Sequence, residues 1–159
     1  MGTEIERKFL VKDDSWRSSA AAGTRILQGY LASDAKITVR VRIRGEAAFL
    51  TIKGATAGIR RSEFEYPIPV DDAESMLREM AVSPVIEKIR YRLPCGAHVW
   101  DLDVFAGDNA GLVLAEVELE AEETAFEMPG WAGQEVSDDS RYYNVNLARS
   151  PFRHWSSDG

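Results

Sequence analysis

Apolar and charged side chains alternate along eight short stretches of the chain. An alternation with a period of two residues is typical of β-strands, because successive side chains point to opposite faces of the sheet. Most stretches are joined by short turns, such as the one near Gly45 and Glu46, and this predicts a largely antiparallel sheet. The predicted strands are 4–11, 24–31, 36–44, 47–53, 62–68, 85–93, 97–105 and 112–120.

Fewer segments carry apolar residues at helical spacing. Residues 71–74 resemble a capping box, and they open an apolar pattern over 73–81 that predicts a helix. From Pro151 onward we expect a mobile tail. The other predicted helices are a weaker one at 14–22, a short one at 121–127 and one at 140–149.

The polar faces of the predicted strands carry charge almost without Ser, Thr, Asn or Gln. Two faces are basic, two or three are acidic, and the first is mixed. An ordinary solvent-facing sheet usually presents a more varied polar surface. The charged positions are Glu4, Glu6, Lys8, Arg40, Arg42, Arg44, Glu63, Glu65, Lys88, Arg90, Arg92, Asp101, Asp103, Glu116, Glu118 and Glu120.

Two arrangements explain such faces. A single charged face is best explained as facing solvent, where its cross-strand ion pairs add a few tenths of a kcal/mol to stability. Taken together, they favour a sheet closed into a barrel around its charged faces, since a lumen holding water, divalent cations and a polyanion tolerates like charges. We therefore predict an α+β, mainly β fold: one domain over 1–159, an eight-stranded antiparallel β-barrel (tunnel) with a charged interior and a few helices packed outside.

Composition and charge narrow the function classes. The 159 residues contain 19 Lys and Arg against 26 Asp and Glu, a net charge of −7, which disfavours nucleic acid and anionic membranes as partners. Cys95 is the single cysteine, so the chain has no internal disulfide. The sequence shows no membrane-length apolar run and no signal-peptide core, so we expect a cytoplasmic protein. The oligomeric state is left open.

Short motifs follow one another along these strands. Glu4, Glu6 and Lys8 match a Glu-x-Glu-x-Lys signature at the N-terminus. With the later matches, the chain resembles the CYTH family, also called triphosphate tunnel metalloenzymes, from about residue 3 to about residue 149. It departs from the family at Tyr143, where a smaller or basic residue is common. The later matches are Arg-x-Arg in 37–42, Lys in 51–53, Arg-x-Glu-x-Glu in 61–65, Lys-x-Arg in 87–90, acidic strands in 101–105 and 116–118, and Arg-Tyr-x-Asn in 141–144.

The resemblance implies a tunnel that binds a polyphosphate together with Mg²⁺ or Mn²⁺. The implied metal ligands are Glu4, Glu6, Glu116 and Glu118, with Asp103 as a fifth. The implied substrate-binding residues are Lys8, Tyr30, Arg40, Arg42, Lys53, Arg61, Lys88, Arg90 and Arg141. Lys8, Lys88 and Arg90 are expected to act in catalysis as well.

The expected reaction is metal-dependent hydrolysis of inorganic triphosphate to diphosphate and phosphate, as in small bacterial members of the family. The group that orients or deprotonates the attacking water stays open between a second cation, a tunnel carboxylate and Lys88. Alternatives are a class IV-like adenylyl cyclase, a thiamine triphosphatase and a non-catalytic polyphosphate-binding module. The glycines at 54–58 form no P-loop, because no Gly-Lys-Ser/Thr follows them.

Overall fold

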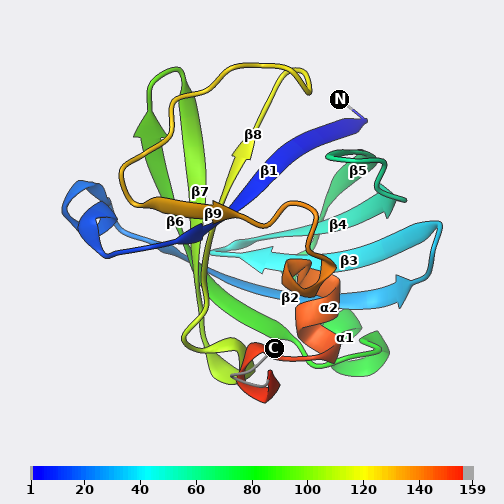
Figure 1. Cartoon of the computed structure of the whole chain (residues 1–159). Helices are drawn as coiled ribbons and strands as arrows, with labels where there is room; N and C mark the ends of the chain where they lie inside the picture. Colours follow the sequence, from blue (N-terminus) through cyan, green and yellow to red (C-terminus); the bar gives the residue numbers. More distant parts are fainter. Residues whose placement is uncertain (1, 156–159) are drawn as a thin grey trace.

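A closed β-barrel organises the protein, and the computed structural model describes residues 2–155 of it (Figure 1). Neighbouring strands follow the order β5-β4-β3-β2-β6-β7-β8-β1, and pairing of β1 with β5 closes the ring. All pairings are antiparallel, so the predicted eight-stranded antiparallel barrel is confirmed. The strands are β1 (Thr3–Val11), β2 (Thr24–Ser33), β3 (Ile37–Arg44), β4 (Ala47–Gly54), β5 (Arg60–Ile68), β6 (Ile86–Cys95), β7 (His98–Phe105) and β8 (Val113–Glu118).

A ninth strand, β9 (Ala132–Glu135), was not predicted. It lies outside the ring and pairs with the second half of β1, where Phe9 faces Glu135 and Val11 faces Ala132. The Arg7 guanidinium on the outer face of β1 forms two hydrogen bonds with the Glu135 carboxylate, at 2.9 and 2.6 Å. This ion pair ties β9 to β1 and directs the following chain across one end of the barrel (Figure 1).

The apolar sides of the strands face away from the lumen and are covered by segments outside the barrel. Helix α1 (Val70–Met80) packs against β2, β3 and β4. A second cluster includes Trp16, Trp100 and Trp131, all at most 9% exposed. Burial of such large rings stabilises the fold from outside, at roughly 25 cal/mol per Å² of apolar surface removed from water. The charged faces are therefore left to the interior.

The helices predicted from the sequence differ in part from those in the structure. The predicted capping box at 71–74 does not form: Pro69 is the N-cap of α1, and no side chain bonds to the free amides there. Segment 14–22 forms only a 3₁₀ turn at Ser15–Ser19, and 121–127 contains no helix. This 3₁₀ turn packs against the barrel through Trp16, its buried residue. No helix within residues 2–155 has both the length and the apolar content to cross a bilayer.

The predicted helix over 140–149 is interrupted at Tyr143. Ser140–Tyr142 forms a 3₁₀ turn, Tyr143 is extended (φ −69°, ψ 134°), and α2 (Asn144–Arg149) follows. We predicted a mobile tail from Pro151, and the structure describes residues 151–155 of it. Here the chain makes another 3₁₀ turn, and the Trp155 ring packs 5.2 Å from the Tyr142 ring. Residues 156–159, also part of that expectation, lie outside the described chain.

Candidate functional site

The barrel encloses a cavity of about 210 Å³. Its wall consists mainly of charged side chains from β1, β3, β4, β5 and β8, completed by the segment that leads into α2. Eleven of the residues expected to act at a site border it. They are Glu4, Glu6, Lys8, Tyr30, Arg40, Arg42, Lys53, Arg61, Arg90, Glu116 and Glu118.

Three buried cations from β3 and β4 form one side of the cavity: Arg40, Arg42 and Lys53, each at most 8% exposed. Arg42 donates to Gln28 at 2.9 Å. Arg40 donates to Thr51 at 3.2 Å, and its buried Nε has no hydrogen-bond partner among residues 2–155. Burial and the neighbouring arginines lower the pKa of Arg42 to about 9. These buried cations repel one another. An anion bound between them would supply hydrogen-bond acceptors and offset the repulsion.

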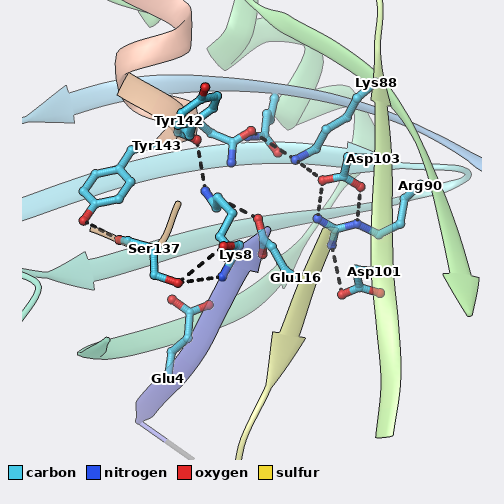
Figure 2. A network of polar contacts seen from close by, with 12 residues as sticks. Glu4, Lys8, Lys88, Arg90, Asp101, Asp103, Glu116, Ser137, Tyr142 and Tyr143 are labelled. Carbon is cyan, nitrogen blue, oxygen red and sulfur yellow. Dashed lines mark hydrogen bonds and ion pairs between the residues drawn. The ribbon is translucent and has the colours of Figure 1, made fainter. Parts of the chain in front are cut away.

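Lys8 lies at the centre of the site (Figure 2). Its Nζ donates to the Tyr142 carbonyl oxygen at 3.0 Å and lies 3.6 Å from a Glu116 carboxylate oxygen. Its backbone N–H donates to the Ser137 hydroxyl at 2.9 Å. Lys8 thus links β1 to β8 and to the segment before α2, and its side chain is 9% exposed.

Behind the cavity wall, Asp103 holds two cations. Its carboxylate accepts two hydrogen bonds from Arg90, both at 2.8 Å, and pairs with Lys88 Nζ at 2.8 Å (Figure 2). Although burial alone would raise it, the pKa of Asp103 falls to about 2 because Lys88 and Arg90 stabilise its charge. Lys88 also donates to Asn144 Oδ1 at 3.1 Å. This buried network fixes the Arg90 guanidinium, which reaches the cavity.

Carboxylates gather on the opposite side, on β1 and β8. Glu6 is partly exposed and borders the cavity. Burial there, together with the nearby Glu116 and Glu4, raises its pKa well above the ordinary value. The pKa of Glu116 is instead held well below its usual range, since Lys8, Arg90 and Lys88 outweigh the effect of burial. The two carboxyl groups thus influence each other's pKa, and the pKa values move in opposite directions.

The donor set on this side fits a hard divalent cation, because all its ligand atoms are carboxylate oxygens. The raised pKa of Glu6 marks a place where another positive charge would be stabilising. Within residues 2–155, however, no three acidic, His or Cys side chains are already gathered as a metal cluster. The Glu4 carboxylate is bound to Lys53 at 3.2 Å and to Arg61 at 3.1 Å. Metal binding here would therefore exchange ion pairs for coordination bonds.

Comparison with known proteins places this site in a family. Residues 2–148 match the CYTH domain. The chain belongs to the CYTH family. A relative named inorganic triphosphatase from Acetivibrio thermocellus is 44% identical over 155 residues, 98% of this chain and 99% of its own. Another of that name from Nitrosomonas europaea is 40% identical over 153 residues, 93% of this chain and 98% of its own.

Solved CYTH-like structures share the barrel. The crystal structure of the inorganic triphosphatase NE1496 superimposes with a TM-score of 0.64 at 38% identity, and the match covers 93% of this chain and 95% of the other. A putative adenylyl cyclase from Hippeastrum with a dominant triphosphatase activity gives a TM-score of 0.59 at 12% identity, over 76% and 81% of the two chains. At that identity the likeness concerns the fold alone.

Three residues expected at the CYTH site lie elsewhere. Arg141 is exposed, bonds to Asp139 at 2.7 Å and stacks on the Trp155 ring, so it cannot reach the cavity as placed. Asp103 does not border the cavity, because Arg90 and Lys88 occupy its oxygens. Lys88 is fully buried beneath the wall.

Other contributors to the wall were missed from the sequence. Ser137 and Tyr143 border the cavity, and so does Asn144. Ser137 follows the unpredicted β9, and no alternation or motif marks it. Asn144 does carry a signal, because it is the last residue of the Arg-Tyr-x-Asn match. Its contact with Lys88 explains why an amide at this position is useful.

The buried Lys88 predicts a pH dependence of stability. Burial and the nearby Arg90 and Arg42 outweigh Asp103 and lower the pKa of Lys88 from 10.5 to about 7. Between these values the unfolded chain binds a proton that the folded protein does not, so a rise in pH favours folding. We expect the free energy of unfolding of the wild type to gain at most about 1.4 kcal/mol per pH unit over Lys88→Met between pH 7 and 10. Denaturant titrations at several pH values measure this, and parallel curves for the two proteins would contradict it.

Proposed function

We propose that this CYTH protein hydrolyses inorganic triphosphate to diphosphate and phosphate inside the barrel, with Mg²⁺ or Mn²⁺ as cofactor. The observation that carries the proposal is the division of one enclosed lumen into a cationic side and a carboxylate side. Phosphoryl transfer relies chiefly on positioning and charge stabilisation, and this lumen supplies fixed charges of both signs. Two relatives at 44% and 40% identity bear the name of this activity.

The cationic side would bind the triphosphate. Arg40, Arg42 and Lys53 approach from β3 and β4, with Arg90 and Lys8 from β6 and β1. All five side chains border the lumen before any anion arrives, and fixed charges placed in this way stabilise the charge that develops on the phosphoryl oxygens. Tyr30 and Arg61 complete this side of the wall.

The carboxylate side would hold the cation through Glu4, Glu6, Glu116 and Glu118. A divalent cation bound there supplies charge neutralisation and alignment of phosphoryl oxygens. The pKa of Glu118 is raised by partial burial and by repulsion from Glu4, Glu63 and Asp101. A cation beside Glu118 would offset this repulsion. In the protein alone, the Lys8–Glu116 and Lys53–Glu4 pairs join the two sides.

The size of the lumen supports triphosphate over larger substrates. Its roughly 210 Å³ lies below the ~300–1,000 Å³ typical of pockets for drug-sized ligands. A cyclase or a thiamine triphosphatase would need additional room for an organic group. A binding module would not need the carboxylate side.

The test is phosphate release from tripolyphosphate with Mg²⁺ or Mn²⁺, run beside a metal-free sample and an ATP sample analysed for cyclic AMP and ADP. We expect metal-dependent release of phosphate and diphosphate in equal amounts. Arg42→Ala should lower the rate by about 10²–10³, by analogy with removal of one oxyanion donor. Arg25→Ala is the matched control, because Arg25 lies outside the barrel and pairs with Glu87. Tight binding of tripolyphosphate without release of phosphate would favour the binding module instead.

A further inference from the structure

One aromatic residue, Tyr143, closes part of the lumen wall. It borders the cavity together with Asn144 and Val145. Its extended backbone separates the 3₁₀ turn from α2, and its ring lies beside Lys8, with the Lys8 Nζ 5.6 Å from the ring centroid. Figure 2 shows the ring on the same side of Lys8 as Ser137. Tyr143 is also the position at which the sequence departs from the family motif.

The ring is held from several directions. Its hydroxyl donates to the Ser137 carbonyl oxygen at 3.3 Å, and its backbone N–H donates to Ser140 at 3.1 Å. The residues on either side are anchored by the two lysines: Lys8 Nζ bonds to the Tyr142 carbonyl, and Lys88 Nζ bonds to the Asn144 side chain. A side chain fixed in this way acts as a wall.

Binding of a phosphate need not displace this segment. An ammonium group has three donors, and Lys8 spends one on the Tyr142 carbonyl while Glu116 lies 3.6 Å away. At least one donor stays free for a phosphoryl oxygen. A phosphate bound by Lys8 would therefore have the Tyr143 ring as its immediate neighbour, so a substituent on that phosphate would collide with the ring.

We propose that Tyr143 is a specificity-determining residue that restricts the lumen to an unsubstituted triphosphate and excludes nucleoside and thiamine triphosphates. The inference rests on the proposed function and names its substrate class. An inorganic triphosphate presents only oxygen atoms at both ends, whereas an organic triphosphate extends a sugar or thiazolium from one end. The wall permits the first and blocks the second.

The experiment compares tripolyphosphate and ATP as substrates of wild type, Tyr143→Ala and Tyr143→Phe. With ATP, water adds to the γ-phosphorus, the β–γ anhydride bond breaks, and ADP, phosphate and a proton are released. The readout is the ratio of kcat/KM for ATP to kcat/KM for tripolyphosphate. Tyr143→Ala should raise this ratio at least about tenfold, the lower end of what pocket shape contributes to discrimination. Tyr143→Phe keeps the ring and should change the ratio by less than about twofold.

Tyr66→Ala is the control for loss of a tyrosine, because Tyr66 is 53% exposed and the ratio should not change. An unchanged ratio in folded Tyr143→Ala would overturn the proposal. So would a lower ratio, which would make the ring a stacking platform for the organic group. If Tyr143→Ala shows no cooperative unfolding transition, Tyr143→Leu replaces it with the same expected direction. If the wild type releases no phosphate from tripolyphosphate, the proposed function fails, and the wall is tested separately through the ratio of Kd values for the two anions.

Discussion

Replacement of Glu116 by glutamine should lower triphosphate hydrolysis by at least about 10²–10³ while leaving the protein folded. Glu116 stays ionised despite its position in the lumen, because Lys8, Arg90 and Lys88 hold its pKa well below the usual range. The amide keeps the size of the side chain but removes the charge. Two effects then combine: the carboxylate side loses the group proposed to hold the cation, and Lys8 loses the carboxylate 3.6 Å from its Nζ.

Steady-state kinetics at a series of Mg²⁺ or Mn²⁺ concentrations measure both effects. A lost metal contact raises the metal concentration needed for half-maximal rate, whereas a displaced Lys8 raises KM for tripolyphosphate. Glu120→Gln is the matched control: Glu120 belongs to the same alternating series, but its side chain is 75% exposed outside the lumen. Turnover of Glu116→Gln within threefold of wild type, with an unchanged metal requirement, is the result that would remove Glu116 from the site.

The strand pattern could be predicted because both faces of each strand have a definite chemistry. Charged residues at alternate positions of β1, β3, β6 and β8 show which side chains share a face. Because these faces contain almost no uncharged polar residues, they indicated a barrel closed around them. β9 could not be predicted. Its four residues, Ala132 to Glu135, show no alternation, and the strand exists because Glu135 meets Arg7, 128 positions earlier in the chain.

The break at Tyr143 shows a tertiary contact overriding a local signal. A continuous helix over 140–149 would use the Tyr142 carbonyl as the acceptor for the Asn146 N–H. In the structure, Lys8 Nζ bonds to that carbonyl, and the Asn146 N–H bonds to Tyr143 instead. The motif match found Arg141, but only the geometry of the 3₁₀ turn reveals that its side chain points outward to Asp139.

The alternation in the sequence predicts which side chains lie on the polar face of a strand. It does not predict which residues of neighbouring strands face each other. Alternation placed Asp103 correctly on the polar face of β7. It could not reveal that Arg90 lies directly opposite on β6 and takes both carboxylate oxygens. Asp103 was expected to be a metal ligand, and in the structure its carboxylate contacts Lys88 and Arg90. A stability measurement tests whether it serves them as a counter-charge.

Asp103→Ala is expected to lower the free energy of unfolding by about 3–5 kcal/mol, the cost of leaving a buried charge without its partner. For a chain of this length the melting temperature should fall by about 6–20 °C. The cost arises chiefly from Arg90, because a guanidinium stays charged when its partner is removed, whereas Lys88, with a pKa of about 7, can release its proton. Thermal and denaturant unfolding without added metal are the measurements.

Asp101→Ala provides the matched comparison. Asp101, on β7, pairs with Arg90 and Arg92 of β6, but its side chain is 31% exposed. Its removal should therefore lower the free energy of unfolding by only about 0–1 kcal/mol. The double variant Arg90→Met/Asp103→Ala should recover much of the stability lost in Asp103→Ala, because it removes both buried charges together. Undiminished stability of Asp103→Ala would show that the buried charge of Arg90 does not depend on this carboxylate, and would leave Arg90 without the anchor assigned to it here.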